Sequence, residues 1–380
     1  MNVSRARFLA AAVLSAVVVH AGGCRPRTGN GIIRTIVGNG VEGYSPGGVP
    51  SRSAAISHSI EALVVMNGHL FYADSKTNKV RMVDYRTGRI MNVAGSGATA
   101  YSGDGMQAVT ANLAHPSGLA VDPYGDLYIS EFHGHRVRRV EHMTGVIRTY
   151  AGTGAERFNG DGIPAASANI SGPASICFDS RGNLYIADFG HSRIRMVDRK
   201  TRKISTIAGT GATTYNGEDL PAVKASVPHP YRVAVDAKGN LYVLDTTYRV
   251  RIVSRLTGRI RTVAGTGDRG FNGDGIPAVS ARLAAPQSFC VDGEGNLYIA
   301  DTLNGRIRVV GVRTGLIRTL AGTGEAGYSG DGGPAPEALV NYPQGGMYVN
   351  DRGDLYFDDA FNFRVRMISG AIQFLRSRAR

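Results

Sequence analysis

Short runs in which apolar and polar residues alternate recur along most of the chain. In one stretch they are Ser288–Asp292, Leu297–Asp301, Arg306–Val310 and Leu316–Ala321, separated by Gly, Asp or Asn residues. Alternation over short runs bounded by turn residues predicts half-buried β-strands. Four such strands in succession, joined by tight turns, predict an antiparallel meander. An Ala-x-x-x-Ala-x-Leu phrase before the first strand of a set predicts no more than a helical turn.

This four-strand pattern repeats along the chain. A phrase of the type Ile-x-Thr-Ile-Ala-Gly recurs at steps of 57, 57, 57, 56 and 57 residues, and its final glycines are Gly38, Gly95, Gly152, Gly209, Gly265 and Gly322. Self-similarity at such a period is typical of repeat architectures. Six four-stranded units around an axis predict an all-β, six-bladed β-propeller. One terminal phrase, Ile32–Gly38 or Ala371–Leu375, is expected to complete the sixth blade, and the sequence leaves open which.

The N-terminus has the pattern of a signal peptide. Arg5 and Arg7 precede an apolar run, Phe8–Val19, that is too short to span a bilayer comfortably. The following Ala21-Gly22-Gly23-Cys24 resembles the bacterial lipobox, so we expect lipidation at Cys24, with ordinary cleavage after Ala21 as the alternative. We expect an exported protein that is periplasmic or lipid-anchored, and otherwise secreted. The predicted boundaries are 1–24 for the signal peptide, 25–31 for a linker, 32–375 for the propeller and 376–380 for a basic tail.

The strand phrases themselves resemble a known repeat. The run His115-Pro116-Ser117-Gly118-Leu119-Ala120-Val121-Asp122 is followed by Asp126-Leu127-Tyr128-Ile129, and similar phrases stand in every unit. This pattern resembles the NHL repeat, as in the NHL propellers of bacterial exported proteins and of the teneurin ectodomain. The resemblance covers residues 32–375 and implies the six-bladed propeller. NHL propellers are mostly binding platforms, and a minority are related to six-bladed lyases and lactonases, so the fold does not give the function.

Composition agrees with a folded all-β chain and adds a basic charge. The 43 Lys and Arg against 30 Asp and Glu give a formal net charge of +13. This charge favours contact with anionic envelope polymers or phospholipid headgroups. Nucleic acid is not an expected partner of an exported protein. The three cysteines are too few for a disulfide scaffold, and Cys177 and Cys290 are interpreted as small core residues.

An acidic residue ends the second strand of each unit, and a basic pair stands in the third. Two-residue spacing on a strand puts both basic side chains of a pair on one face. The structural interpretation is that the second residue of each pair, here called the inner arginine, meets the acid of its own or the next blade. The alternative is a basic ring for an anionic ligand. The predicted structural residues are Asp74, Glu131, Asp188, Asp245, Asp301 and Asp359, with Arg81, Arg138, Arg195, Arg251, Arg308 and Arg366.

A second set of acids lies in the Gly-rich linkers between units. They follow an aromatic residue and are Asp104, Asp161, Glu218, Asp274 and Asp331. Calcium takes six to eight oxygen ligands, so one carboxylate per loop favours a tight turn over a metal site. No cofactor is predicted, although a divalent metal, calcium or zinc, stays open as an alternative.

Histidine and aromatic residues collect in the loops of one predicted face. In a propeller, the loops before the first strand and between the second and third strands lie on the same side. Loop-borne histidines and aromatics suit ligand binding, and two or three histidines could hold a metal. The candidate binding residues are His58, His115, His133, His135, His191, His229, Tyr231 and Tyr248.

These features favour a non-catalytic binding platform that engages a protein, peptide or glycan of the cell envelope. Neither a paired Cys/His arrangement nor an H-E-x-x-H motif is present, and no catalytic residue is assigned. A metal-dependent lyase or lactonase of the six-bladed type is the alternative, and binding of anionic polymers or nucleic acid is a remote one. We expect a monomer.

Overall fold

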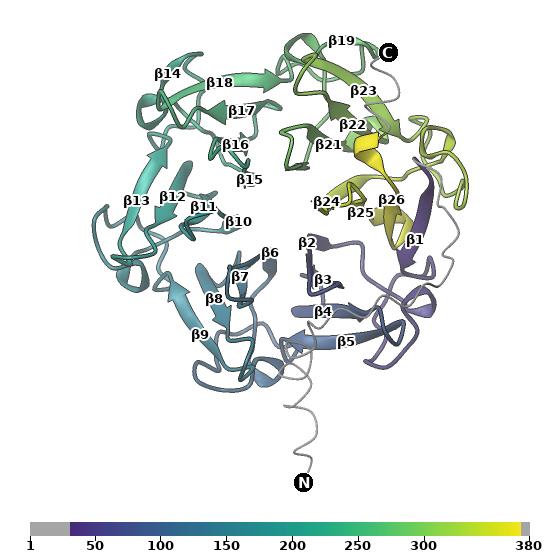
Figure 1. The fold of residues 1–380 in the computed structure, drawn as a ribbon. Helices are drawn as coiled ribbons and strands as arrows, with labels where there is room; N and C mark the ends of the chain where they lie inside the picture. Colours follow the sequence, from purple (N-terminus) through teal and green to yellow (C-terminus); the bar gives the residue numbers. More distant parts are fainter. Residues whose placement is uncertain (1–30, 374–380) are drawn as a thin grey trace.

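The alternating runs form four-stranded antiparallel blades, and the blades surround a central axis (Figure 1). The computed structural model describes residues 31–373, so the predicted signal peptide, Cys24 and the basic tail lie outside the described residues. Within this range the prediction of an all-β, six-bladed propeller is confirmed. None of the helical segments described is long and apolar enough to cross a membrane.

The strands follow the predicted meander from the axis outward, as Figure 1 shows. Blades one and two consist of β2 (Ile60–Met66), β3 (His69–Asp74), β4 (Lys79–Asp84), β5 (Arg89–Ala94), β6 (Pro116–Val121), β7 (Leu127–Glu131), β8 (Arg136–Val140) and β9 (Ile147–Ala151). Blades three and four consist of β10 (Pro173–Phe178), β11 (Leu184–Asp188), β12 (Arg193–Val197), β13 (Ile204–Ala208), β15 (Arg232–Val235), β16 (Leu241–Leu244), β17 (Val250–Val253) and β18 (Arg259–Ala264). Blades five and six consist of β20 (Ser288–Val291), β21 (Leu297–Asp301), β22 (Arg306–Val310), β23 (Leu316–Ala321), β24 (Pro343–Val349), β25 (Leu355–Asp359), β26 (Arg364–Ile368) and β1 (Ile33–Val37).

The N-terminal phrase closes the ring. β1 pairs antiparallel with β26, in a register that sets Ile33 opposite Ile368. The competing C-terminal phrase does not form a strand where it is described, since residues 371–373 make a helical turn. The amide of Gly31 and the carbonyl of Ser369 add a 2.6 Å hydrogen bond at the start of this pairing. Blade six therefore joins the two ends of the described chain.

The linkers cover the outer edges of the blades. The predicted helical turns are short 3-10 turns, namely η1 (Ser51–Ser53), η2 (Ala108–Thr110), η3 (Ala165–Ser167), η4 (Ala222–Lys224), η5 (Ala278–Ser280) and η7 (Ala335–Glu337). Two further 3-10 turns, η6 (Thr302–Asn304) and η8 (Ala360–Asn362), lie between the second and third strands. Before η4 and η5, the two-residue strands β14 (Leu220–Pro221) and β19 (Ile276–Pro277) pair with β18 and β23. Single bridges do the same elsewhere, as at Gln107 and Val146. An unpaired edge would invite pairing with another chain, and the linkers limit that exposure.

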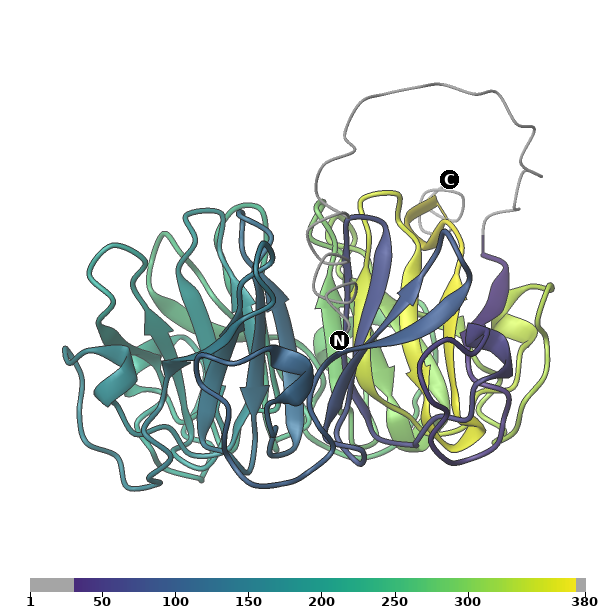
Figure 2. The same cartoon turned by 90° about the horizontal axis from the view of Figure 1, so that it is seen from below.

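The hydrophobic core lies between the blades. Each of the six buried clusters joins two neighbouring blades, and the cluster at the closing seam includes Ile60 and Leu63 of blade one with Tyr356 and Val365 of blade six. Seen from the side, the blades stand upright around the axis (Figure 2). Their flat faces pack against each other, and the strand ends and turns form the two open faces of the ring.

The inner arginine of each third strand is completely buried. All six of these arginines are 0% exposed. Arg138 shows the arrangement, with Glu131 of its own blade at 2.9 Å and Asp104 of the preceding linker at 2.6 Å. The Tyr101 ring of that linker lies 4.9 Å from the guanidinium. Arg195, Arg308 and Arg366 likewise pair with one carboxylate of the blade and one of the linker.

Blades one and four vary this arrangement. Arg81 donates to the carbonyl of Ser45 as the other inner arginines donate to a linker carbonyl, but Gly47 stands where other linkers carry the acid. Arg251 lies 4.0 Å from Asp245 and donates to the carbonyls of Ser226 and Gly217. In every blade an aromatic ring of the linker still covers the arginine, at 4.8 to 5.1 Å. The linker acids of four blades are thus partners of buried arginines.

We expect Arg308→Ala to destabilise the ring strongly, because it leaves Asp301 buried without its cation. Removal of one partner of a buried ion pair costs about 3–5 kcal/mol. Arg313→Ala, at an exposed turn of the same blade, is the matched control and should change stability by less than about 0.5 kcal/mol. Urea unfolding measures both variants. Equal losses in the two would contradict a role for the buried pair.

Candidate functional site

One face of the ring carries a connected group of histidines and aromatic residues, here called the aromatic patch. It consists of His115, Phe132, His133, Phe189, His229 and Tyr231. The His115 and His133 rings lie 4.6 Å apart, and the Phe132 and Phe189 rings 5.5 Å apart. Phe189 continues the contact to His229 at 4.9 Å and to Tyr231 at 5.4 Å. The patch therefore runs across blades two, three and four without a break.

The loops that carry this face are held between neighbouring blades. The Asn78 side chain of blade one accepts a hydrogen bond from the His115 amide of blade two, at 3.0 Å. His135 accepts one from the Gly172 amide in the same way, also at 3.0 Å. Several of these loop residues have positive φ without being glycine, among them His115 at 60° and His229 at 41°. Such backbone persists only where the surrounding structure fixes it, as it often is at functional sites.

The electrostatic environment favours neutral imidazoles in this region. Partial burial lowers the pKa of His115, and the neighbouring His133 lowers it further, although Glu61 acts in the opposite direction. Partial burial also lowers the pKa of His135, against the effect of Glu156. At neutral pH, His115 and His135 therefore carry no charge, and His115 can offer a ring nitrogen as an acceptor.

A smaller aromatic group lies on the same face at blades six and one. Tyr342 and Phe361 stack with their rings 4.6 Å apart and nearly parallel, at 7°. The His58 ring meets Phe361 edge-on at 6.1 Å, and Glu42 lies 2.7 Å from His58. Phe361 is 48% exposed. Of the candidate residues, His58 thus lies apart from the aromatic patch.

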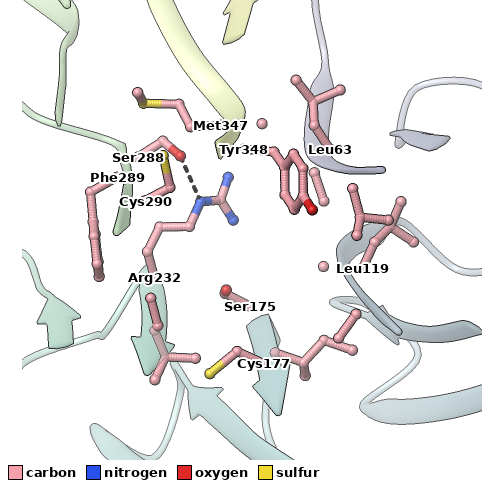
Figure 3. Close-up of a pocket in the computed structure, with 18 of the residues that line it drawn as sticks. Leu63, Leu119, Ser175, Cys177, Arg232, Ser288, Phe289, Cys290, Met347 and Tyr348 are labelled. Carbon is pink, nitrogen blue, oxygen red and sulfur yellow. Dashed lines mark hydrogen bonds between the residues drawn. The ribbon is translucent and has the colours of Figure 1, made fainter. Parts of the chain in front are cut away.

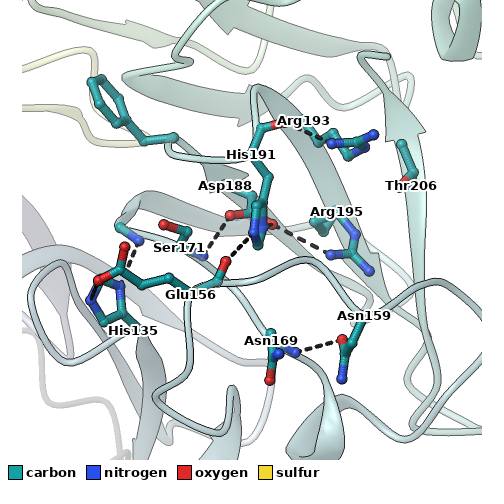
Figure 4. A network of polar contacts seen from close by, with 12 residues as sticks. His135, Glu156, Asn159, Asn169, Ser171, Asp188, His191, Arg193, Arg195 and Thr206 are labelled. Atoms are coloured by element: carbon teal, nitrogen blue, oxygen red, sulfur yellow. Dashed lines mark hydrogen bonds and ion pairs between the residues drawn. The ribbon is translucent and has the colours of Figure 1, made fainter. Parts of the chain in front are cut away.

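The remaining candidates are occupied by contacts within the protein. The His191 side chain is 9% exposed and lies 2.9 Å from Asp188, and its other nitrogen meets the carbonyl of Glu156 (Figure 4). His135 lies 3.2 Å from the Glu156 carboxylate. Arg269 donates to the hydroxyl of Tyr248. His191 in particular holds the linker of blade three in place and presents little surface to a ligand.

The central channel contains an arginine that was not among the residues predicted from the sequence. Arg232 projects from β15 into the middle of the ring (Figure 3). Its guanidinium donates to the carbonyls of Ala174, Glu61 and Gly345, at 3.2, 2.7 and 3.0 Å, and to the Ser288 hydroxyl at 3.3 Å. The Glu61 carboxylate lies 3.6 Å away. One side chain of blade four therefore links blades one, three, five and six.

The sequence did contain a signal for this contact. The third position of the Pro-x-Gly phrase is Gly118, Ser175, Ser288 and Gly345 in four units, whereas it is Arg232 in blade four. In blade one, directly across the ring, Ala62 stands at this position and Glu61 directly precedes it. An arginine in a row of small residues, with a glutamate next to that row on the opposite blade, indicates a cross-channel contact.

The channel next to Arg232 encloses a cavity of about 270 Å³. Its wall is mostly apolar and includes Leu63, Leu119, Phe289 and Met347. Cys177 and Cys290 also line it, and they pack in or against the buried clusters between blades, as expected for small core residues. Burial raises the pKa of both thiols, which keeps them protonated at neutral pH. Within residues 31–373, no group of three His, Cys, Asp or Glu side chains is placed to hold a metal ion.

Asp358 adds a buried carboxyl at the seam between blades six and one. It is 1% exposed, and neither side-chain oxygen has a hydrogen-bond partner of normal geometry. Burial raises the pKa of Asp358 well above its usual range, and the nearby Glu61 and Asp359 raise it further, although the Gly345 amide lowers it. The other blades have Ala, Ser or Leu at this position. The folded ring therefore favours the protonated form of Asp358.

Comparison with known proteins gives matches to one repeat family and to one fold. The family model described as NHL repeat matches residues 113–140 and 171–195. Human NHL repeat-containing protein 2 is 26% identical over 328 residues, which cover 77% of this chain and 45% of that protein. Teneurin-3 of Danio rerio is 31% identical over 296 residues, which cover 68% of this chain and 11% of that protein. The chain spans less than half the length of either relative.

Among solved structures, an auxiliary nutrient binding protein from Bacteroides thetaiotaomicron is similar. The TM-score is 0.64 at 18% identity, and the match covers 89% of this chain and 76% of that chain. At this identity the likeness shows the fold alone.

Asp358→Asn should stabilise the ring at neutral and alkaline pH. Because the carboxyl has a raised pKa in the folded state, its contribution to stability is full below about pH 4 and falls as the pH rises. The Asn amide does not ionise, so the variant does not lose stability in this way. The thermal midpoints of the variant and the parent should therefore agree near pH 4 and separate towards pH 9. Asp351→Asn, at an exposed turn of the same blade, is the control. A constant difference between Asp358→Asn and the parent at all pH values would contradict the argument.

Arg232→Ala should destabilise the ring although Arg232 belongs to no repeated motif. The change removes hydrogen bonds to four other blades and leaves Glu61 without its cation. We expect a loss of about 2–4 kcal/mol, since hydrogen bonds to charged groups contribute about 1.5–3 kcal/mol each and water can enter the channel to compensate in part. Arg261→Ala, on an exposed position of the same blade, should have little effect. Chemical denaturation measures the free energy of unfolding of both variants. Equal denaturation midpoints for Arg232→Ala and Arg261→Ala would contradict the cross-channel role.

Proposed function

Since this chain belongs to the NHL-repeat six-bladed β-propellers, we propose that it is an exported, non-catalytic binding platform for a protein, peptide or glycan. The ligand contacts the face that carries the aromatic patch. The signal-peptide pattern of residues 1–24 supports export. A protein from the same fold class is described as nutrient binding, which is in keeping with a binding role.

The continuity of the aromatic patch carries this proposal. Six rings from three blades touch in sequence on loops that the scaffold fixes. Aromatic side chains supply large contact areas at a small loss of conformational entropy, and they dominate many binding surfaces. Neutral histidines beside them can accept or donate hydrogen bonds. Such a surface suits a peptide side chain or the apolar face of a sugar ring.

The platform is better supported than the metal-dependent lyase or lactonase. That alternative requires a ligand set for a metal ion at the mouth of the channel. In the part of the chain that the structure describes, no three metal-ligating side chains converge, and the channel is spanned by Arg232. Arg232, Glu61 and Ser288 instead satisfy one another within the protein.

The double variant Phe132→Ala, Phe189→Ala tests the platform. Ligands are first selected with the parent protein from an oligosaccharide array and from a phage-displayed library of short random peptides. We expect the double variant to bind the selected ligand at least about 30-fold more weakly, because truncation of a central aromatic residue commonly costs about 2 kcal/mol or more. Affinity is measured by isothermal titration calorimetry.

Tyr124→Ala is the matched control, since Tyr124 is an exposed aromatic residue, 59% accessible, on the turn between β6 and β7 at the opposite face. It should leave the affinity unchanged. The platform proposal fails if neither library yields a ligand, or if the double variant binds as tightly as the parent.

A further inference from the structure

The face opposite the aromatic patch is formed by the turns between strands one and two and between strands three and four. Its cations are concentrated in blades three and four. Here eight exposed Lys and Arg residues, called the basic ridge, stand on four turns: Arg181, Arg199, Lys200, Arg202, Lys203, Lys238, Arg255 and Arg259. The same turns contain three carboxylates, Asp179, Asp198 and Asp236. The corresponding turns of blade two, residues 122–126 and 141–146, contain no Lys or Arg.

The carboxylates of the ridge are bound within their own turns. Asp179 accepts hydrogen bonds from the Arg181 and Asn183 amides, and Asp236 accepts the equivalent pair from Lys238 and Asn240. Asp198 accepts from the Lys200 and Thr201 amides. Arg259 in addition pairs with Asp219 of the preceding linker, at 3.0 Å. Eight cations against these three carboxylates and Asp219 leave the ridge positive.

Large apolar side chains project from the same face. Leu256 lies beside Arg255 at the tip of a blade-four turn and is 95% exposed, the highest value among the exposed large hydrophobic residues. Tyr124 is 59% and Met143 51% exposed, both on neighbouring blade two. The Arg199 guanidinium lies 4.9 Å from the Tyr124 ring, so the ridge and these tips form one surface. A fully exposed leucine between cations has no partner within the described fold.

The ends of the described chain lie on this face as well. Gly31, the first described residue, bonds to Ser369 directly after β26, and the Ala371 amide donates to Gly353 in the turn before β25. The segment that precedes Gly31 contains the apolar run Phe8–Val19 and Cys24. Any attachment of that segment to a membrane would therefore bring this face, and not the aromatic patch, towards the lipid.

We propose that the basic ridge and its apolar tips form a docking surface for a bilayer that contains anionic phospholipids. Each Lys or Arg near an anionic surface contributes about 1 kcal/mol, and projecting apolar residues enter the interfacial region. A polyanion such as a nucleic acid would bind the cations, but its charged backbone offers no apolar contact for the protruding Leu256. In the docked protein the aromatic patch faces away from the membrane, so it stays open to a ligand.

The chain contains no tryptophan, so Leu256→Trp introduces a single fluorescent reporter at the ridge in the full-length protein. The probe is a vesicle of phosphatidylglycerol and phosphatidylcholine, compared with one of phosphatidylcholine alone. We expect a blue shift of the emission with the anionic vesicles only, reduced as salt rises from about 0.05 to about 0.5 M because the attraction is screened. The emission of this tryptophan depends only on the surroundings of position 256. Attachment to the vesicle through residues 1–30 alone therefore does not produce the shift.

Leu303→Trp is the matched reporter, since Leu303 is 52% exposed in η6 between β21 and β22, on the face opposite the ridge. It should show no shift. In the Leu256→Trp background, Arg199→Glu, Lys200→Glu and Arg255→Glu together should abolish the shift. The triple change Arg52→Glu, Lys224→Glu and Arg282→Glu, at exposed linker positions, alters the net charge equally and should preserve it.

Three results would overturn the docking surface: no shift with anionic vesicles, an equal shift at position 303, or equal loss in the two triple variants. A shift with heparin or a single-stranded oligonucleotide, together with none on vesicles, would assign the ridge to a polyanion instead. Thermal midpoints of all variants confirm that the ring is intact. The test is independent of the ligand face, because Phe132 and Phe189 are unchanged throughout.

Discussion

A buried guanidinium is the constraint around which each blade of this propeller is organised. An arginine that is 0% exposed is stable only if its charge and its donors are matched. The blade supplies one carboxylate, the preceding linker supplies another in four blades, and an aromatic ring covers the group. Blade, linker and ring thus become one unit, and the linker cannot leave the outer edge without exposing the arginine. This requirement accounts for the constant spacing between the arginine, the acids and the linker aromatic residue from one repeat to the next.

The two faces of the ring differ because the repeats tolerate variation only where this network does not reach. On one face, loops between neighbouring blades carry histidines and aromatic residues. On the other, turns carry cations and projecting apolar side chains. The carboxylates that stabilise the turns are nearly constant, for example Asp179 and Asp236, whereas the tips differ from blade to blade. A symmetrical scaffold thereby presents two asymmetrical surfaces.

The parts of the structure that follow from local pattern were predictable from the sequence. Strand alternation and the regular spacing of glycines specify the blades, because both reflect contacts within one unit. The identity of the closing strand was not predictable, since both terminal phrases have the strand pattern and only the pairing of β1 with β26 distinguishes them. His133 and His191 occupy loops of the same type, yet only the structure shows that Asp188 and the Glu156 carbonyl occupy His191. Arg232 and Asp358 act across seams, so their roles depend on the distance between blades that are far apart in sequence.

The closing strand has a consequence for how the protein is made. Synthesis produces β1 first and its partner β26 last, and the Ser369 hydroxyl and Ile32 carbonyl that meet at this pairing are 337 residues apart. During translation β1 has no partner in its own blade, although the blades that follow can each form from local contacts. Long-range pairing of this kind slows folding and leaves an unpaired strand open to association with other chains. The last step of folding is therefore the pairing of β1 with β26. This pairing can form only after both strands have been synthesised.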